Sequence, residues 1–417
     1  MPAKNLIPFI LVTFLFFAWG LANNMTDTLL AAFKKIMSMS DVKTSLIQMS
    51  FYGAYFLLAL PAALFIYRFT YKAGVLLGLG LFVTGALLFY PASNTMVYGH
   101  FLTALFILAG GLSILETTSN PYIIAMGPVE TGTRRLNLAQ SFNPIGSITG
   151  VLLSKFYILS KLNRAGADER ALMSADQLQT MQSDELNAVM GPYVGVAFVL
   201  VIVWILIATV KMPAASERGR MEEFLPTFFR LFRKRNYRMG VIAQFFYVGA
   251  QIGVWSFTIR YVMQEIGVNE EKAANFYLAA LLLFVSARFV FTALMKYFSP
   301  RSLLAFSAIM AFIASLMVAF TGGALGAYSL VAISFFMSLM FPTIYGMAVE
   351  GLGNDMKVGG SGLIMAILGG AVITFIQGQI SDLTGSILLA YLVPAACFIV
   401  VLIYSLRAKK LASDLVE

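Results

Sequence analysis

Uncharged apolar segments of about 20 residues recur along this chain, and they constrain its fold more than any other feature. A helix of that length crosses the roughly 30 Å hydrocarbon core of a bilayer. Hydrophobic residues make up 59% of the chain and charged residues only 12%, whereas a soluble domain carries about twice that charged fraction. We therefore predict an all-α membrane protein rather than a soluble enzyme with an apolar core.

The apolar windows between charged or turn-rich breaks predict twelve transmembrane helices in two pseudo-symmetric bundles of six. The N-terminal bundle occupies residues 1–211 and the C-terminal bundle occupies 239–417. A signal peptide is the alternative for the first window, but that window is too long and many spans follow it. The predicted helices cover 7–30, 44–66, 73–92, 97–127, 136–160, 191–211, 239–263, 273–297, 302–320, 326–349, 358–381 and 386–407.

The charged segment 212–238 separates the two sets of six helices. Its second half, FLPTFFRLFRKRNYR, interleaves aromatic and cationic residues, which is typical of an interfacial helix on an anionic leaflet. If this linker, both termini and every second loop share one side, that side holds about two thirds of the 29 Lys and Arg residues. Positive residues in short loops favour the cytoplasm, so we predict cytoplasmic termini and a cytoplasmic linker.

Residues suited to metal or nucleophilic chemistry are scarce. The chain has one cysteine, Cys397, and one histidine, His100, so neither a disulfide framework nor a cysteine metal site can be built. The sequence also lacks a Gly-rich phosphate loop, which a membrane-embedded glycosyltransferase or similar enzyme would be expected to need. The net charge of +9 is spread over short loops rather than one face, which argues against nucleic acid. We therefore expect that the protein is not an enzyme and binds neither a metal nor an organic cofactor.

Two carboxylates, Asp27 and Glu116, lie within predicted spans of the N-terminal half. A charged group is costly in the bilayer core, and a carboxyl removed from water favours its neutral form. Such a group can exchange a proton, as a proton-coupled carrier requires. The alternative is that Asp27 ends its helix near the headgroups and pairs with Lys34 or Lys35.

Polar side chains follow one helical face in each of four predicted spans, because they recur at three to five residues. Amides on such faces also serve as hydrogen bonds between helices, and for any single Asn or Gln that alternative is equally good. The four faces contain Trp19, Asn23 or Asn24, and Asp27; Ser113, Glu116 and Asn120; Gln140, Asn143 and Ser147; and Gln244, Tyr247 or Val248, Gln251 and Trp255.

These side chains suit a small neutral polyhydroxylated ligand. Carboxylates and amides bond neighbouring hydroxyls, and Trp and Tyr offer apolar faces to a sugar ring. The predicted spans contain no cluster of Arg or Lys for a phosphate or dicarboxylate. Arg288 is the single cation that lies well inside a predicted span rather than near its end, and we expect it to pair with backbone or to extend toward the interface.

Four long stretches, FFAWGLANNMTDTLLAAFKKIM, ILETTSNPYI, RLNLAQSFNPIGSITG and FPTIYGMA, resemble the L-fucose:proton symporter family of the major facilitator superfamily. The resemblance covers essentially the whole chain. It implies a major facilitator fold and sugar uptake driven by a proton gradient through alternating access. It also implies a monomer in a bacterial inner membrane, with a neutral sugar, a proton and the lipid bilayer as partners.

The resemblance also implies roles for individual residues. Asp27 matches the proton-carrying aspartate, and Glu116 matches the glutamate that links protonation to sugar. The sugar-contacting positions match Trp19, Asn24, Gln140, Asn143 and Tyr345. With the polar face of the seventh helix, we expect the substrate site to contain Trp19, Asn24, Glu116, Gln140, Asn143, Gln244, Gln251 and Tyr345.

Members of this family carry L-fucose, glucose, galactose or N-acetylglucosamine, and the match around Asp27 and Glu116 favours L-fucose. A drug:proton antiporter is a more distant alternative. The chain departs from the superfamily pattern in the loop YRFTYKAG, which keeps Arg68, Lys72 and Gly74 but lacks the acidic residue. This departure leaves open how the cytoplasmic side is held closed.

Overall fold

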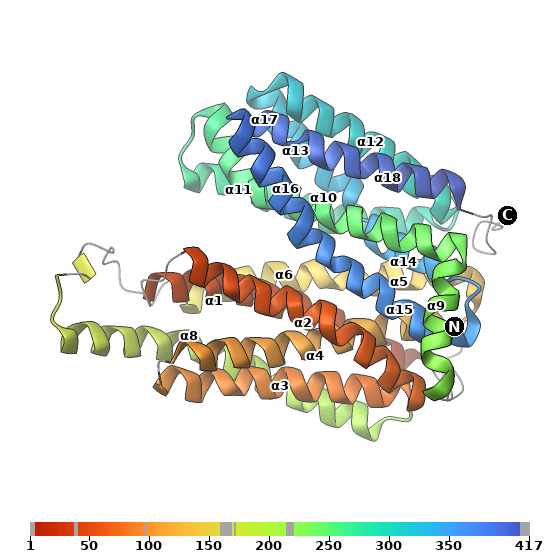
Figure 1. Ribbon diagram of the computed structural model, residues 1–417, viewed down its shortest axis with the longest axis horizontal. Coiled ribbons are helices and arrows are strands. Elements are labelled where there is room, and N and C mark those ends of the chain that lie inside the picture. Colours follow the sequence, from red (N-terminus) through yellow and green to blue (C-terminus); the bar gives the residue numbers. More distant parts are fainter. Residues whose placement is uncertain are drawn as a thin grey trace.

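The computed structural model describes residues 5–36, 41–95, 97–158, 169–170, 172–213 and 221–408, and every regular element within them is helical. Figure 1 shows their arrangement. The longer helices of the first bundle and the linker are α1 (Leu6–Ile36), α2 (Asp41–Arg68), α3 (Tyr71–Thr95), α4 (Tyr98–Ala125), α5 (Gly132–Gln140), α6 (Phe142–Leu153), α8 (Ala175–Thr209) and α9 (Phe224–Arg233). Those of the second bundle are α10 (Arg235–Ile266), α11 (Glu270–Leu294), α12 (Pro300–Thr321), α13 (Gly323–Met337), α14 (Met340–Val349), α15 (Met356–Met365), α16 (Gly369–Thr384), α17 (Ile387–Ala390) and α18 (Leu392–Arg407).

Among the described residues, ten helical segments are long and apolar enough to cross a membrane. Several of them join two helices, such as α13 with α14 and α15 with α16. The other two predicted spans correspond to α1, whose apolar part is Leu6–Ala22, and to α5 with α6. The prediction of an all-helical protein with many spans is therefore confirmed.

The sixth predicted span begins earlier than expected. We placed its start near residue 191, but α8 begins at Ala175. The Ser174 side chain accepts a hydrogen bond from the Gln177 amide, and the Gln177 side chain accepts one from the Ser174 amide. This capping box satisfies backbone donors at the start of the helix, so residues 175–190 of the expected loop are helical.

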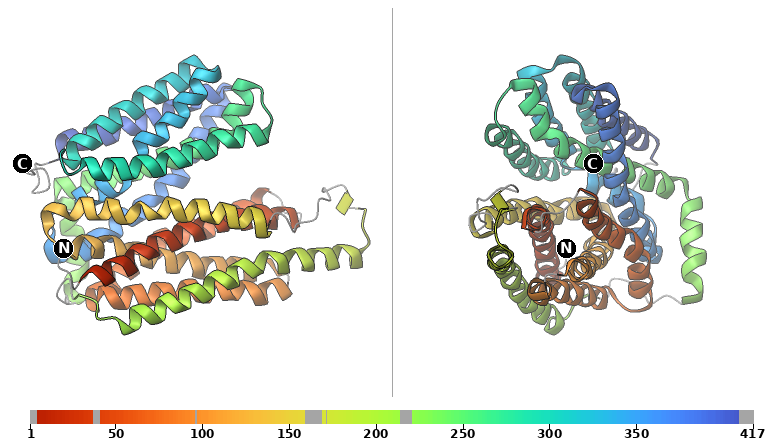
Figure 2. Two further views of the ribbon diagram at one scale, coloured as in Figure 1. Left: turned by 180° about the vertical axis from the view of Figure 1, so that it is seen from behind. Right: turned by 60° about the vertical axis from the view of Figure 1, so that its left-hand side comes forward.

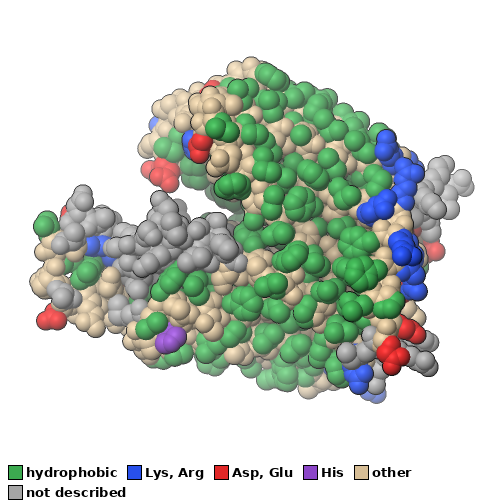
Figure 3. All heavy atoms as spheres, in the orientation of Figure 1, with side chains coloured by type: hydrophobic (Ala, Val, Ile, Leu, Met, Phe, Trp, Pro, Cys, Tyr) green, Lys and Arg blue, Asp and Glu red, His purple; other side chains and the backbone are tan. Residues whose placement is uncertain are grey.

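The helices form two bundles, one from α1 to α8 and one from α10 to α18 (Figures 1 and 2). The bundles meet near the end where both termini lie and stand apart at the other end, where the space-filling view is hollowed between them (Figure 3). Lys and Arg side chains gather at the closed end (Figure 3). Buried residues of α14 and α15, including Tyr345 and Ile364, join the core of the first bundle.

Helices α1 and α6 approach so closely that their contact requires glycine. A Cβ atom on Gly146 would collide with the backbone carbonyl oxygen of Phe17, and one on Gly20 would collide with that of Asn143. The Asn143 side chain also donates a 3.2 Å hydrogen bond to the Phe16 carbonyl. Small residues allow such backbone contact between helices in a membrane, so α1 and α6 form one tightly packed unit.

The linker contains an amphipathic helix, α9, which is shorter than predicted because α10 already begins at Arg235. Leu231 is buried, whereas Leu225 and Phe229 are 55% and 64% exposed on another face. Arg230 forms a 2.9 Å ion pair with Asp355 and so ties α9 to the second bundle. Its location at the membrane surface remains a prediction.

Candidate substrate and proton site

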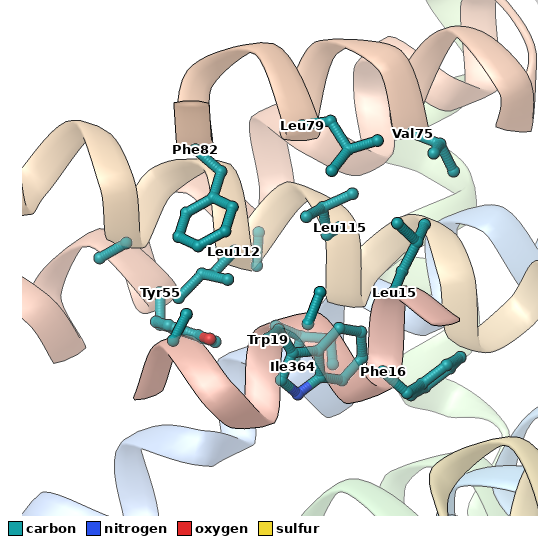
Figure 4. Packing of buried hydrophobic residues seen from close by; sticks show 14 of the residues in the cluster. Leu15, Phe16, Trp19, Tyr55, Val75, Leu79, Phe82, Leu112, Leu115 and Ile364 are labelled. Carbon is teal, nitrogen blue, oxygen red and sulfur yellow. The ribbon is translucent and has the colours of Figure 1, made fainter. Parts of the chain in front are cut away.

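Glu116 lies in α4 and is only 5% exposed. The Tyr55 hydroxyl of α2 lies 3.4 Å from Glu116 Oε1 and donates to it. The Ser113 hydroxyl donates to the Tyr55 carbonyl over 3.1 Å. Ser113 and Glu116 therefore share a face, as their spacing predicts, and that face meets α2. Figure 4 shows Tyr55 beside Leu112 of α4.

A chain of hydrogen bonds connects the Glu116 backbone to α5. The Asn120 amide donates to the Glu116 carbonyl over 3.0 Å, and Gln140 Nε2 donates to Asn120 Oδ1 over 2.8 Å. Asn120 is fully buried and Gln140 is 4% exposed. Two of the expected site residues, Glu116 and Gln140, thus belong to one polar network inside the first bundle.

Trp19 and Asn24 lie on α1. Trp19 is 3% exposed, and its ring centroid lies 4.4 Å from that of Phe16. In Figure 4 it also lies beside Ile364, which comes from the second bundle. Asn24 is half-buried, with its amide nitrogen 3.5 Å from the Gly20 carbonyl. The structure keeps Trp19 near the contact between the bundles.

Asp27 lies within α1, but its side chain is outside the part of the structure that is described. The same holds for Asn23, and for the expected pairing of Asp27 with Lys34 or Lys35. The role of Asp27 therefore remains a prediction from the sequence.

Tyr345 of α14 brings the second bundle to this site. Its side chain is fully buried and belongs to the hydrophobic core of the first bundle. A Cβ atom placed on Gly360 of α15 would lie only 2.6 Å from that hydroxyl. The hydroxyl has no hydrogen-bond partner among the described residues. A buried hydroxyl without a partner is costly, so Tyr345 is suited to bonding a ligand.

Gln244 and Gln251 lie on α10 of the second bundle. Gln244 is fully buried, and neither atom of its amide has a hydrogen-bond partner in the described residues. Gln251 is half-buried. No described hydrogen bond joins either residue to Glu116, so their part in the site remains a prediction.

Polar contacts that the sequence did not predict cross between the bundles. The Asn137 amide of α5 donates to the Thr343 hydroxyl of α14 over 3.2 Å. Lys357 Nζ, in α15, lies 5.3 Å from the ring centroid of Tyr71 in α3. The sequence shows that these side chains are polar. Which residue of the other bundle each one contacts depends on how the two bundles dock.

Arg288 pairs with backbone, which was one of its two expected arrangements. Its Nε donates to the Ser338 carbonyl over 2.5 Å and its Nη1 donates to the Gln140 carbonyl over 2.8 Å. Because Arg288 is only 3% exposed, the alternative of extension toward the interface is wrong.

Comparison with known proteins places this geometry in a family. The Major Facilitator Superfamily description matches residues 9–376. The chain is 42% identical over 420 residues to an L-fucose-proton symporter of Haemophilus influenzae, covering 98% of both chains. It is 39% identical to the L-fucose-proton symporter of Escherichia coli K12, covering 96% of this chain and 92% of the relative. A glucose/galactose transporter of Brucella abortus is 34% identical, with coverage of 96% and 93%.

A solved structure agrees along the whole chain. The crystal structure of the transporter FucP in the outward conformation matches with a TM-score of 0.92 and 38% identity, covering 98% of this chain and 100% of that one. The overall fold of this chain therefore follows a known architecture. This chain belongs to the Major Facilitator Superfamily.

Proposed function

We propose that this protein imports L-fucose together with a proton. The observation that carries the proposal is its full-length similarity to two L-fucose-proton symporters, at 42% and 39% identity. The proposal is also supported by the buried acid Glu116, which is hydrogen-bonded to Tyr55 and could bond sugar hydroxyls. The gathering of Lys and Arg side chains at one end (Figure 3) supports cytoplasmic termini in a bacterial inner membrane. We further propose that the protein works as a monomer.

The arrangement of the bundles supports alternating access. They meet at the terminus-bearing end and stand apart at the other end (Figures 2 and 3), and the similar FucP structure is described as outward. In the proposed cycle, Asp27 accepts a proton and the sugar bonds Glu116 and the nearby amides. The bundles then rock, both cargoes leave to the cytoplasm, and Asp27 deprotonates before the empty carrier returns.

A sugar panel tests the proposed function directly. The purified protein is reconstituted in liposomes, and uptake of labelled L-fucose, glucose, galactose and N-acetylglucosamine is measured with and without an imposed pH gradient. We expect accumulation of L-fucose only when the outside is more acidic. Accumulation of glucose or galactose instead would favour the second candidate, a hexose:proton symporter, which the 34% identity to a glucose/galactose transporter supports.

Glu116→Ala is expected to weaken L-fucose binding about ten- to a hundredfold, because a hydrogen bond to an acid is lost from a buried site. Calorimetric titration with L-fucose measures the change. Ser113→Ala is the matched control, since its hydroxyl bonds the Tyr55 carbonyl on the same face, and its affinity should stay within about threefold of wild type. Equal losses in both variants would show that packing of α4, rather than the acid, sets affinity.

A further inference from the structure

Two prolines, one in each bundle, leave backbone carbonyls without their helical donors. Pro144 has no N–H to donate to the carbonyl four residues earlier, which is that of Gln140. Pro342 likewise leaves the carbonyl of Ser338 without its donor. The helices are interrupted at these points, since α5 ends at Gln140 and α13 ends at Met337. Both carbonyls are therefore free to accept a bond from elsewhere.

Arg288 donates to both of these carbonyls. The bond to Gln140 reaches into the first bundle, whereas Ser338 belongs to the second bundle with Arg288 itself. The guanidinium also lies 4.6 Å from the ring centroid of Phe284, which is favourable for a buried cation. One side chain thus joins the bundles at the residue whose amide is linked through Asn120 to Glu116.

We propose that Arg288 is a releasable lock between the two bundles, and that Pro144 and Pro342 keep its two acceptors available. Opening the terminus-bearing end breaks the bond to Gln140, while the bond to Ser338 can persist because both groups lie in the second bundle. Arg288 is then held in place for the lock to form again. The inference rests on the proposed alternating access and assigns a positioning role to Arg288.

The chemistry of the acceptors suits a contact that must break in every cycle. The planar fork of a guanidinium can reach two acceptors at once, which a lysine cannot do with the same geometry. A neutral carbonyl binds the cation without forming a buried ion pair, and an ion pair that loses one partner leaves an uncompensated charge. The two acceptors are backbone carbonyls and carry no ionisable group of their own.

The lock is tested by the accessibility of a reporter cysteine in the full chain, without sugar or a pH gradient. Thr133→Cys is introduced into a Cys397→Ala background, because Thr133 is 2% exposed and packs against Gly346 of the other bundle. Its rate of reaction with a maleimide is measured in nanodiscs. We expect Arg288→Met to raise the rate about tenfold, since a buried hydrogen bond to a charged group is lost.

The proline variants separate this lock from general packing. Pro144→Ala and Pro342→Ala restore an N–H that competes for the same carbonyls, so each should raise the rate about three- to tenfold. In combination with Arg288→Met, neither proline substitution should raise the reaction rate further, because all three changes act on the same contact. The matched control is Pro61→Ala, at an exposed position of α2, which should stay within about twofold of the parent.

Three results would overturn the proposal: an unchanged rate in Arg288→Met, unchanged rates in both proline variants, or proline effects that add fully to that of Arg288→Met. If Arg288→Met does not yield folded protein, Arg288→Lys and the proline variants decide. Failure of the sugar proposal is distinguishable, because a reporter shift without L-fucose uptake would sink the proposed function alone. Normal L-fucose uptake without a reporter shift would sink the lock alone.

Discussion

Asp27→Asn is expected to abolish sugar-driven proton uptake while sugar exchange across the membrane survives. An amide cannot carry a proton through the cycle, so the coupling ion is lost. Exchange requires only that the loaded carrier change its facing side, which a permanently neutral side chain at this position permits. An entrapped pH dye reports acidification of liposomes on addition of L-fucose, and a labelled-sugar exchange assay reports movement of the carrier.

Asp382→Asn provides a matched control, because Asp382 is an exposed acid on α16, and its acidification should equal that of wild type. If Asp27→Asn liposomes still acidify at the wild-type rate, Asp27 does not carry the proton. The alternative prediction for Asp27, pairing with Lys34 or Lys35, would then be preferred. In that case the variant should lose thermal stability and keep its coupling.

Gly146→Ala is expected to destabilise the folded protein by about 3 kcal/mol or more, because overpacking of a tight contact cannot be relieved by a flexible side chain. The added methyl group would collide with the Phe17 carbonyl oxygen, which belongs to the backbone. Helix propensity acts in the opposite direction, since alanine favours a helix over glycine by about 1 kcal/mol. The yield of monodisperse protein and its thermal unfolding midpoint measure the net effect.

The control for this substitution is Gly191→Ala in α8. Among the described residues, a Cβ atom on Gly191 would meet no atom of another segment within 4 Å, so only the gain in helix propensity remains and the midpoint should stay equal or rise. The two changes are chemically identical and predicted to have opposite signs. Equal midpoints for both variants would show that α1 and α6 can separate at little cost.

The long spans were predictable because hydropathy and length decide them locally. The shared face of Ser113 and Glu116 was also predictable, because helical spacing places them together and both contact Tyr55. The start of α8 was readable in principle from Ser174 and Gln177. The polar composition of that region concealed it, since the capping box precedes the apolar window by many residues.

The partners of these faces could not be predicted from spacing. Tyr55 and Glu116 lie 61 positions apart, and Arg288 and Gln140 lie 148 apart. Their pairing depends on how whole helices and bundles dock. The spacing of residues within one helix does not determine which other helix that face contacts. The two carbonyls that Arg288 bonds are a partial exception. A proline within a helix identifies, four residues upstream, a carbonyl that lacks its helical donor.

The glycine contact between α1 and α6 has a mechanical consequence. Two helices whose backbones are in contact cannot slide or tilt past one another without a steric collision, so α1 and α6 move as one rigid unit. This unit contains Asp27 in α1 and Asn143 in α6. In the proposed cycle, a displacement of α1 that follows protonation of Asp27 would therefore reach Asn143 through backbone contact rather than through flexible side chains.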